Sequence, residues 1–170
     1  MKYQKILIIG GIGAGKTTLA EKISKLLKIK NYEMDDLVHK RRDIHIHHTP
    51  FMRDKKLKLI LKRKTWILEG FYDHPWTYPI YKKVDLIIIL DIKISIAKKR
   101  IITRYLKRKV FQNKNKNINK QFKTVLKLLK KISKNSEFIK IQKELVKKYN
   151  KDSIILNTKK EITKFLNEIK

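Results

Sequence analysis

The sequence contains no cysteine, only five glycines and three prolines, and 15 acidic residues against 44 lysines and arginines. The lack of cysteine excludes disulfides and thiolate metal sites. No apolar run approaches the ~20 residues of a membrane span, and the first residues lead directly into a strand-like segment, which leaves no room for a signal peptide. We therefore expect a cytoplasmic protein without a membrane partner. At 170 residues, the chain is long enough for one α/β domain with a full core.

Four of the five glycines fall in one short stretch, residues 10–18, which reads GGIGAGKTT. The stretch fits G-x-x-x-x-G-K-[ST], the P-loop, in which glycines allow positive φ and bring backbone N–H groups against phosphate oxygens. An apolar run at 5–9 precedes it, and apolar residues at helical spacing follow it over 19–27. This context predicts a phosphate site at a helix N-terminus, with Lys16 reaching the β- and γ-phosphates and Thr17 offering a hydroxyl to Mg²⁺.

Strand-like and helix-like segments alternate along the rest of the chain. We expect strands at 4–9, 31–34, 66–69, 85–91 and 153–156, and helices at 15–28, 49–64, 94–107, 120–133, 136–149 and from 158 onward. Thr49-Pro50 reads as an N-cap followed by proline at the first helical position, and 158–161 as a capping box. Residues 71–81, with two of the prolines, read as a loop. The alternation predicts a three-layer P-loop NTPase fold, with a five-stranded parallel sheet in the order 2-3-1-4-5 and helices on both faces.

Several residues that could carry chemistry come directly after predicted strands. They are Gly15, Asp35, Glu69 with Gly70, and Asp91. The carboxyl ends of parallel strands meet at one edge of a sheet, where α/β proteins bind their ligands. We therefore expect these residues to converge on one site.

Further motifs appear in a characteristic order along the chain. They are the P-loop, Asp35 at the end of the second strand, Thr49-Pro50, Trp66-Ile67-Leu68-Glu69-Gly70, and Arg100 with Arg104 after the fourth strand. With these motifs the sequence resembles the adenylate-kinase-like P-loop kinases of small molecules and nucleotides, and most closely the prokaryotic proteins called DNA topology modulation proteins. The resemblance extends over nearly the whole chain.

The resemblance implies roles for particular residues. Glu69 would hold Mg²⁺ through water, together with Thr17. Asp35 would orient the acceptor hydroxyl or contact Mg²⁺ indirectly, and Asp36 competes for that role. Arg100 and Arg104, one helical turn apart, would stack on the donor adenine and neutralise the transferring phosphate. The expected catalytic residues are Lys16, Asp35, Glu69 and Arg104, and the expected ATP-binding residues are Gly11, Ile12, Gly13, Ala14, Gly15, Lys16, Thr17, Thr18 and Arg100.

The role of Asp91 stays open between support of the site and capping of the next helix. The resemblance further implies a single P-loop kinase domain over 1–170, with an acceptor-binding segment at about 36–65 and a short lid at about 108–120.

The acceptor side departs from the nucleotide-kinase pattern. Those enzymes carry G-F-P-R after the strand, whereas residues 70–74 read GFYDH and contain no arginine. Lys40-Arg41-Arg42 could substitute for it, and Tyr72 or Trp76 could stack on a base or simply pack in the loop. The identity of the acceptor is therefore open.

The formal charge of +29 has two interpretations. Because the lysines are spread along every predicted helix, we favour a solvated basic surface with non-specific polyanion binding over a dedicated nucleic-acid site. For His45, His47 and His48, with His39 standing apart, we favour a solvated loop over a metal site.

The leading hypothesis is an ATP- and Mg²⁺-dependent phosphotransferase acting on a small molecule. The alternatives are a nucleic-acid-associated ATP-binding protein or ATPase, and an ATP-binding regulator without transfer activity.

Overall fold

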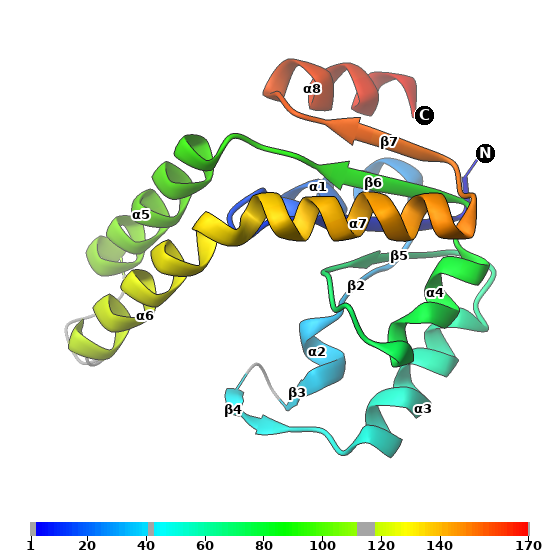
Figure 1. Cartoon of the computed structure of the whole chain (residues 1–170), viewed down its shortest axis with the longest axis horizontal. Coiled ribbons are helices and arrows are strands. Elements are labelled where there is room, and N and C mark those ends of the chain that lie inside the picture. Colours follow the sequence, from blue (N-terminus) through cyan, green and yellow to red (C-terminus); the bar gives the residue numbers. More distant parts are fainter. Residues whose placement is uncertain (1–2, 41–42, 112–117, 170) are drawn as a thin grey trace.

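A five-stranded parallel sheet forms the centre of the molecule (Figure 1). The structure, a computed structural model, describes residues 3–40, 43–111 and 118–169, and their side chains except those of 43–45, 108–111 and 118–122. The strands of this sheet are β1 (Lys5–Gly10), β2 (Asn31–Glu33), β5 (Trp66–Glu69), β6 (Leu86–Leu90) and β7 (Ser153–Leu156). The α/β class and the parallel five-stranded sheet are confirmed.

The strand order is β2-β5-β1-β6-β7, with β1 in the middle. Numbered along the whole chain it is therefore 2-5-1-6-7, and the expected 2-3-1-4-5 is corrected. The reason is an antiparallel pair that the sequence pattern does not predict, β3 (His39–Lys40) with β4 (Asp43–His47), which precedes β5 and forms a separate sheet. In the central register Ile8 lies between Glu69 of β5 and Ile88 of β6. The pairing of β1 with β5 therefore brings Glu69 to the end of β1 from which the P-loop begins.

Helices cover both faces of the sheet. They are α1 (Lys16–Leu27), α2 (Asp35–Val38), α3 (Pro50–Leu61), α4 (Tyr78–Lys83), α5 (Ile94–Phe111), α6 (Ile118–Lys131), α7 (Asn135–Tyr149) and α8 (Lys159–Glu168), with 3-10 turns η1 (Pro75–Thr77) and η2 (Ile132–Lys134). Alternate residues of β1 point to opposite faces, as the strand repeat requires. Leu7 and Ile9 pack with α3, α4 and α7, whereas Ile6 and Ile8 pack with α1 and α8.

The two helix starts that were predicted from capping residues, at Thr49 and Thr158, are confirmed. Thr49 caps α3 by accepting a hydrogen bond from the Met52 N–H at 3.3 Å, with Pro50 as the first helical residue. Thr158 accepts from the Glu161 N–H at 3.2 Å. Residues 71–81 differ from the expected loop, because η1 and α4 begin within them.

Helices α5 and α6 extend side by side away from the sheet (Figure 1). We call this pair the α5–α6 arm. The expected lid at 108–120 falls in it, but residues 112–117 and the lid's side chains lie outside the described residues. Within the part of the chain that is described, no helix is long and apolar enough to cross a membrane.

Candidate functional site

The P-loop connects the central strand β1 to α1. Gly13 and Gly15 have φ values of 75° and 97°, in the left-handed region that side chains rarely adopt. A Cβ on Gly13 would lie 2.9 Å from the Ala97 carbonyl oxygen of α5, so glycine is required there for space as well as conformation. The Lys16 ammonium donates to the carbonyls of Gly10 and Gly11 at 3.1 and 3.0 Å. The loop thus has the backbone shape of a phosphate cradle, with its lysine folded over it.

Thr17 and Glu69 lie side by side at the carboxyl edge of the sheet. The Thr17 hydroxyl donates a 2.6 Å hydrogen bond to Glu69 Oε1, and the Glu69 side chain is only 5% exposed. Burial raises the pKa of Glu69, although the Thr17 hydroxyl and the Lys16 charge lower it in part. Burial likewise lowers the pKa of Lys16, with Glu69 and Asp35 acting against that shift. The two oxygens therefore lie together, close enough to the Lys16 ammonium for its charge to act on Glu69.

A cavity of about 1380 Å³ opens over the P-loop. The expected catalytic, ATP-binding and metal-binding residues all line it, although they come from four separate segments. They are Gly11, Ile12, Gly13, Ala14, Gly15, Lys16, Thr17, Thr18, Asp35, Glu69, Arg100 and Arg104. Gly15, Asp35, Glu69 and Gly70 meet at this cavity as expected, whereas Asp91 does not line it. The individual roles of these residues stay predictions.

Asp35, at the start of α2, and Tyr72 form another part of the cavity wall. The Tyr72 hydroxyl donates to Asp35 Oδ1 at 2.6 Å, and burial together with Asp35 raises the pKa of the phenol. Asp35 lines the cavity, and Asp36 does not. The Tyr72 ring lies 5.6 Å from that of Trp76, and Arg53 of α3 lies 4.7 Å above the Trp76 ring. An arginine of α3 thus stands behind the Asp35–Tyr72 pair, with Trp76 between them.

The two arginines of α5 lie near the P-loop. Arg100 donates to the Ala14 carbonyl at 2.6 Å, so its guanidinium is bonded to the loop backbone. Arg104 lines the cavity one turn further along the helix. Arg41 and Arg42, proposed as acceptor ligands, and the side chain of Arg108 lie outside the described residues.

Asp91 and the histidines do not join this site. Asp91 pairs with Lys143 of α7 at 2.9 Å and lines a second, smaller cavity together with Gly11 and Ala14, and its role stays a prediction. His39 and His47 lie on the β3–β4 strand pair with ring centroids 4.6 Å apart, which corrects the expected solvated loop. Among the described residues, no group of three or more His, Cys, Asp or Glu is placed to hold a metal ion.

The sequence pattern misses several residues of α6, η2 and α7 that contact the P-loop or line the cavities. Asn135, the first residue of α7, bonds to the backbone of Ile12. Gln142, one of the cavity residues, is fully buried, and neither atom of its side-chain amide has a hydrogen-bond partner. Lys130, Lys131 and Lys134 also line the larger cavity and add positive charge to it. No local signal marks these residues, because polar residues at such positions in a basic amphipathic helix read as solvated.

Comparison with solved structures finds proteins of the same architecture. The chain is similar to shikimate kinase from Acinetobacter baumannii in complex with shikimate, with a TM-score of 0.58 and 18% identity over 98% of this chain and 90% of that one. It is similar to deoxyadenosine kinase from M. mycoides with bound dATP, with a TM-score of 0.52 and 16% identity over 98% and 99%. For shikimate kinase from Bacteroides thetaiotaomicron the values are 0.50 and 14%, over 96% and 94%.

These likenesses show that the chain has the fold of the adenylate-kinase-like P-loop kinases. No protein-family model matches the sequence, and no curated protein sequence matches it. The expected likeness to DNA topology modulation proteins is not supported by these comparisons. Only the likeness in fold to the adenylate-kinase-like P-loop kinases is retained. At such low identity, the activity follows only from the site itself.

Proposed function

We propose that this protein is an ATP-dependent kinase that transfers the γ-phosphoryl group of ATP to a hydroxyl group of a small molecule. The observation that carries the proposal is the single cavity that reaches from the P-loop to the Asp35–Tyr72 pair. One part of its lining has the backbone of a phosphate cradle, and another part presents the Asp35 carboxylate beside the Tyr72 phenol. That arrangement suits a donor and an acceptor held next to each other.

The residues at the P-loop fit ATP with Mg²⁺. Gly13 and Gly15 supply the positive-φ backbone that a phosphate-binding loop uses. Thr17 with Glu69 presents two oxygen atoms of the kind that Mg²⁺ prefers. When bound, Mg²⁺ would offset charge on the phosphates. Lys16 moves from the Gly10 and Gly11 carbonyls to the phosphates, because these offer it a stronger, charge-assisted partner. Arg104 would stabilise the transferring group.

At the acceptor end, the Asp35 carboxylate would accept the proton of the attacking hydroxyl. The acceptor oxygen forms a bond to the γ-phosphorus, the bond from that phosphorus to the bridging oxygen of ADP breaks, and the proton passes to Asp35. Tyr72 holds Asp35 in place through its hydrogen bond. We place the acceptor-binding segment at about 36–65, since Arg53 of α3 stands behind this end of the cavity. The segment at about 108–120 would act as a lid.

A phosphotransfer panel tests the proposal. Wild-type protein, Lys16→Ala and Lys25→Ala are incubated with Mg-ATP labelled on the γ-phosphate and with sugars, polyol acids, nucleosides and nucleotides. Transfer to one class of acceptor is expected in the wild type and in Lys25→Ala, which alters an exposed lysine of the same helix α1. Lys16→Ala should lose at least about a hundredfold in rate, as expected when one positioned donor to the developing charge is removed.

Two results would contradict the proposal. Transfer to no acceptor, together with ATP hydrolysis that polynucleotide stimulates, would favour the nucleic-acid-associated ATPase. Tight ATP binding without either transfer or hydrolysis would favour a regulator.

A further inference from the structure

Asn135 holds the backbone of the P-loop through two hydrogen bonds. Its Oδ1 accepts from the Ile12 N–H at 3.0 Å, and its Nδ2 donates to the Ile12 carbonyl at 3.1 Å, across 123 residues of sequence. The residue is 5% exposed, so water competes little with these bonds. One amide thus satisfies both backbone groups of a loop residue.

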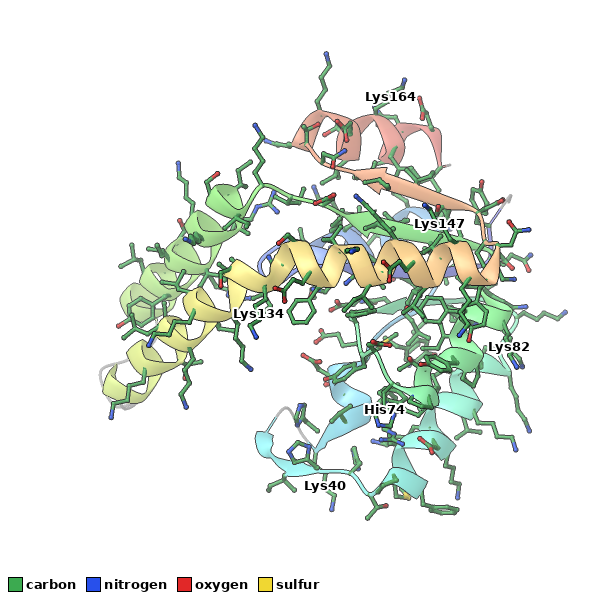
Figure 2. All side chains as sticks on the ribbon, viewed as in Figure 1. Lys40, His74, Lys82, Lys134, Lys147 and Lys164 are labelled. Atoms are coloured by element: carbon green, nitrogen blue, oxygen red, sulfur yellow. The ribbon has the colours of Figure 1, made fainter. Side chains whose placement is uncertain are left out.

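The position of Asn135 in the fold connects the loop to the α5–α6 arm. Asn135 begins α7 directly after η2, which follows α6. Its neighbour Lys134 marks this junction in Figure 2. On the other side of the loop, α5 contacts the next two residues, since Ala97 packs against Gly13 and Arg100 bonds to the Ala14 carbonyl. The start of α5 and the first residue of α7, which follows the arm and η2, therefore contact consecutive residues of the P-loop.

Gly11 shows how closely Asn135 fits the loop. A Cβ on Gly11 would overlap the Cγ and Nδ2 atoms of Asn135. Gly11 is not among the glycines with positive φ, so its backbone conformation is open to alanine. The side chain of Asn135 is therefore what requires glycine at position 11.

We propose that Asn135 is a positioning residue that holds the P-loop in its phosphate-binding shape and so sets the affinity of this protein for ATP. A loop that has lost these two bonds must be ordered by the ligand itself, which weakens binding. The inference rests on the proposed function, because it takes the P-loop to be an ATP site. Loss of two neutral hydrogen bonds predicts a Kd for ATP about tenfold higher.

Four proteins test this in a double-mutant cycle, with the Kd for Mg-ATP measured by titration calorimetry. Asn135→Ala and Gly11→Ala should each weaken ATP binding about tenfold. Gly11→Ala should add little in the Asn135→Ala background, because the added methyl group occupies space that the amide has left. Thermal melts ensure that every variant is measured while folded. Equal Kd values for wild type and Asn135→Ala, or losses that simply multiply in the double variant, would overturn the inference.

Asn135→Asp supplies a second readout, the pH dependence of ATP binding, which a general loosening of the structure would leave unchanged. The carboxylate keeps an acceptor for the Ile12 N–H but faces the Ile12 carbonyl without a donor, whereas the protonated carboxyl group restores the donor. The Kd of Asn135→Asp, divided by that of Asn135→Ala at the same pH, should fall as the pH is lowered from 8 to 5.5. A ratio that does not change with pH would count against the inference.

These measurements separate the inference from the proposed function. A wild-type protein that binds ATP but phosphorylates no acceptor would contradict the kinase proposal, while the Kd values still decide the role of Asn135. A wild-type protein that binds no ATP would contradict both.

Discussion

The Tyr72 hydroxyl donates a 2.6 Å hydrogen bond to Asp35 Oδ1 and so joins the segment after β5 to the start of α2. Glycine at position 70 allows these two segments to pack closely, because a Cβ there would lie only 2.9 Å from the Met34 Cβ. The two segments therefore approach each other closely, and they hold the proposed proton acceptor at one end of the cavity.

Tyr72→Phe should raise the KM for the acceptor about fivefold while leaving the KM for ATP unchanged, since one hydrogen bond to a partly exposed carboxylate is lost. Steady-state kinetics with each substrate varied in turn measure both values. Tyr78→Phe serves as the matched control, because Tyr78 packs against Tyr149 away from the cavity. An effect confined to the KM for ATP would place Tyr72 on the donor side instead.

The paired oxygens of Thr17 and Glu69 predict a clear contrast between two substitutions. Thr17→Ser keeps the hydroxyl and should retain most of the activity. Thr17→Ala removes it and should lower kcat about a hundredfold, the loss typical of one group that stabilises developing charge. Rates are compared over a series of Mg²⁺ concentrations, and similar Mg²⁺ dependence in both variants would exclude Thr17 as a metal ligand.

Glu69 predicts a pH-dependent stability. Because burial raises its pKa, the folded state binds the proton more tightly than the unfolded state does. This group therefore makes the wild type less stable as the pH rises from the ordinary value of 4.5 through the higher folded pKa. Glu69→Gln lacks the buried charge and should melt at a higher temperature than the wild type at neutral pH.

Thermal melts of ligand-free protein between pH 4.5 and 8 test that prediction. The difference in Tm between Glu69→Gln and wild type should grow as the pH rises. Glu144→Gln, an exposed substitution on α7, should show no such trend. A difference that shrinks with pH would mean that the carboxylate is stabilised in the folded state.

The buried amide of Gln142 predicts a gain in stability on its removal. Neither its Oε1 nor its Nε2 has a partner, and each carries a desolvation cost. Gln142→Met keeps a similar volume and should raise the free energy of unfolding by about 1 kcal/mol. Gln142→Glu, which buries a charge at the same place, should lower it. Denaturant titrations measure the free energy of unfolding of each variant. A Gln142→Met variant less stable than the wild type would show that the amide of Gln142 has hydrogen-bond partners in solution.

Short-range signals predicted much of the fold because each depends on neighbouring residues. Thr49 and Pro50 mark the start of α3 through a bond to a residue three positions away, and the glycines of 10–18 mark a turn that needs positive φ. The β3–β4 pair and α4 were missed. Residues 39–47 contain no continuous apolar run, and the prolines of 71–81 read as loop signals although Pro79 lies in the first turn of α4.

The sequence by itself determined the P-loop, the alternation of strands and helices and the acids at the strand ends, because these depend on contiguous residues and on a parallel sheet that aligns its carboxyl edges. Only the tertiary structure decided which side chains from distant parts of the sequence lie near the carboxyl edge of the sheet. Asn135 against Ile12 and Arg53 above Trp76 follow from the directions in which α7 and α3 pack. Such packing depends on the whole core rather than on any local pattern, so no spacing in the sequence marks these contacts in advance.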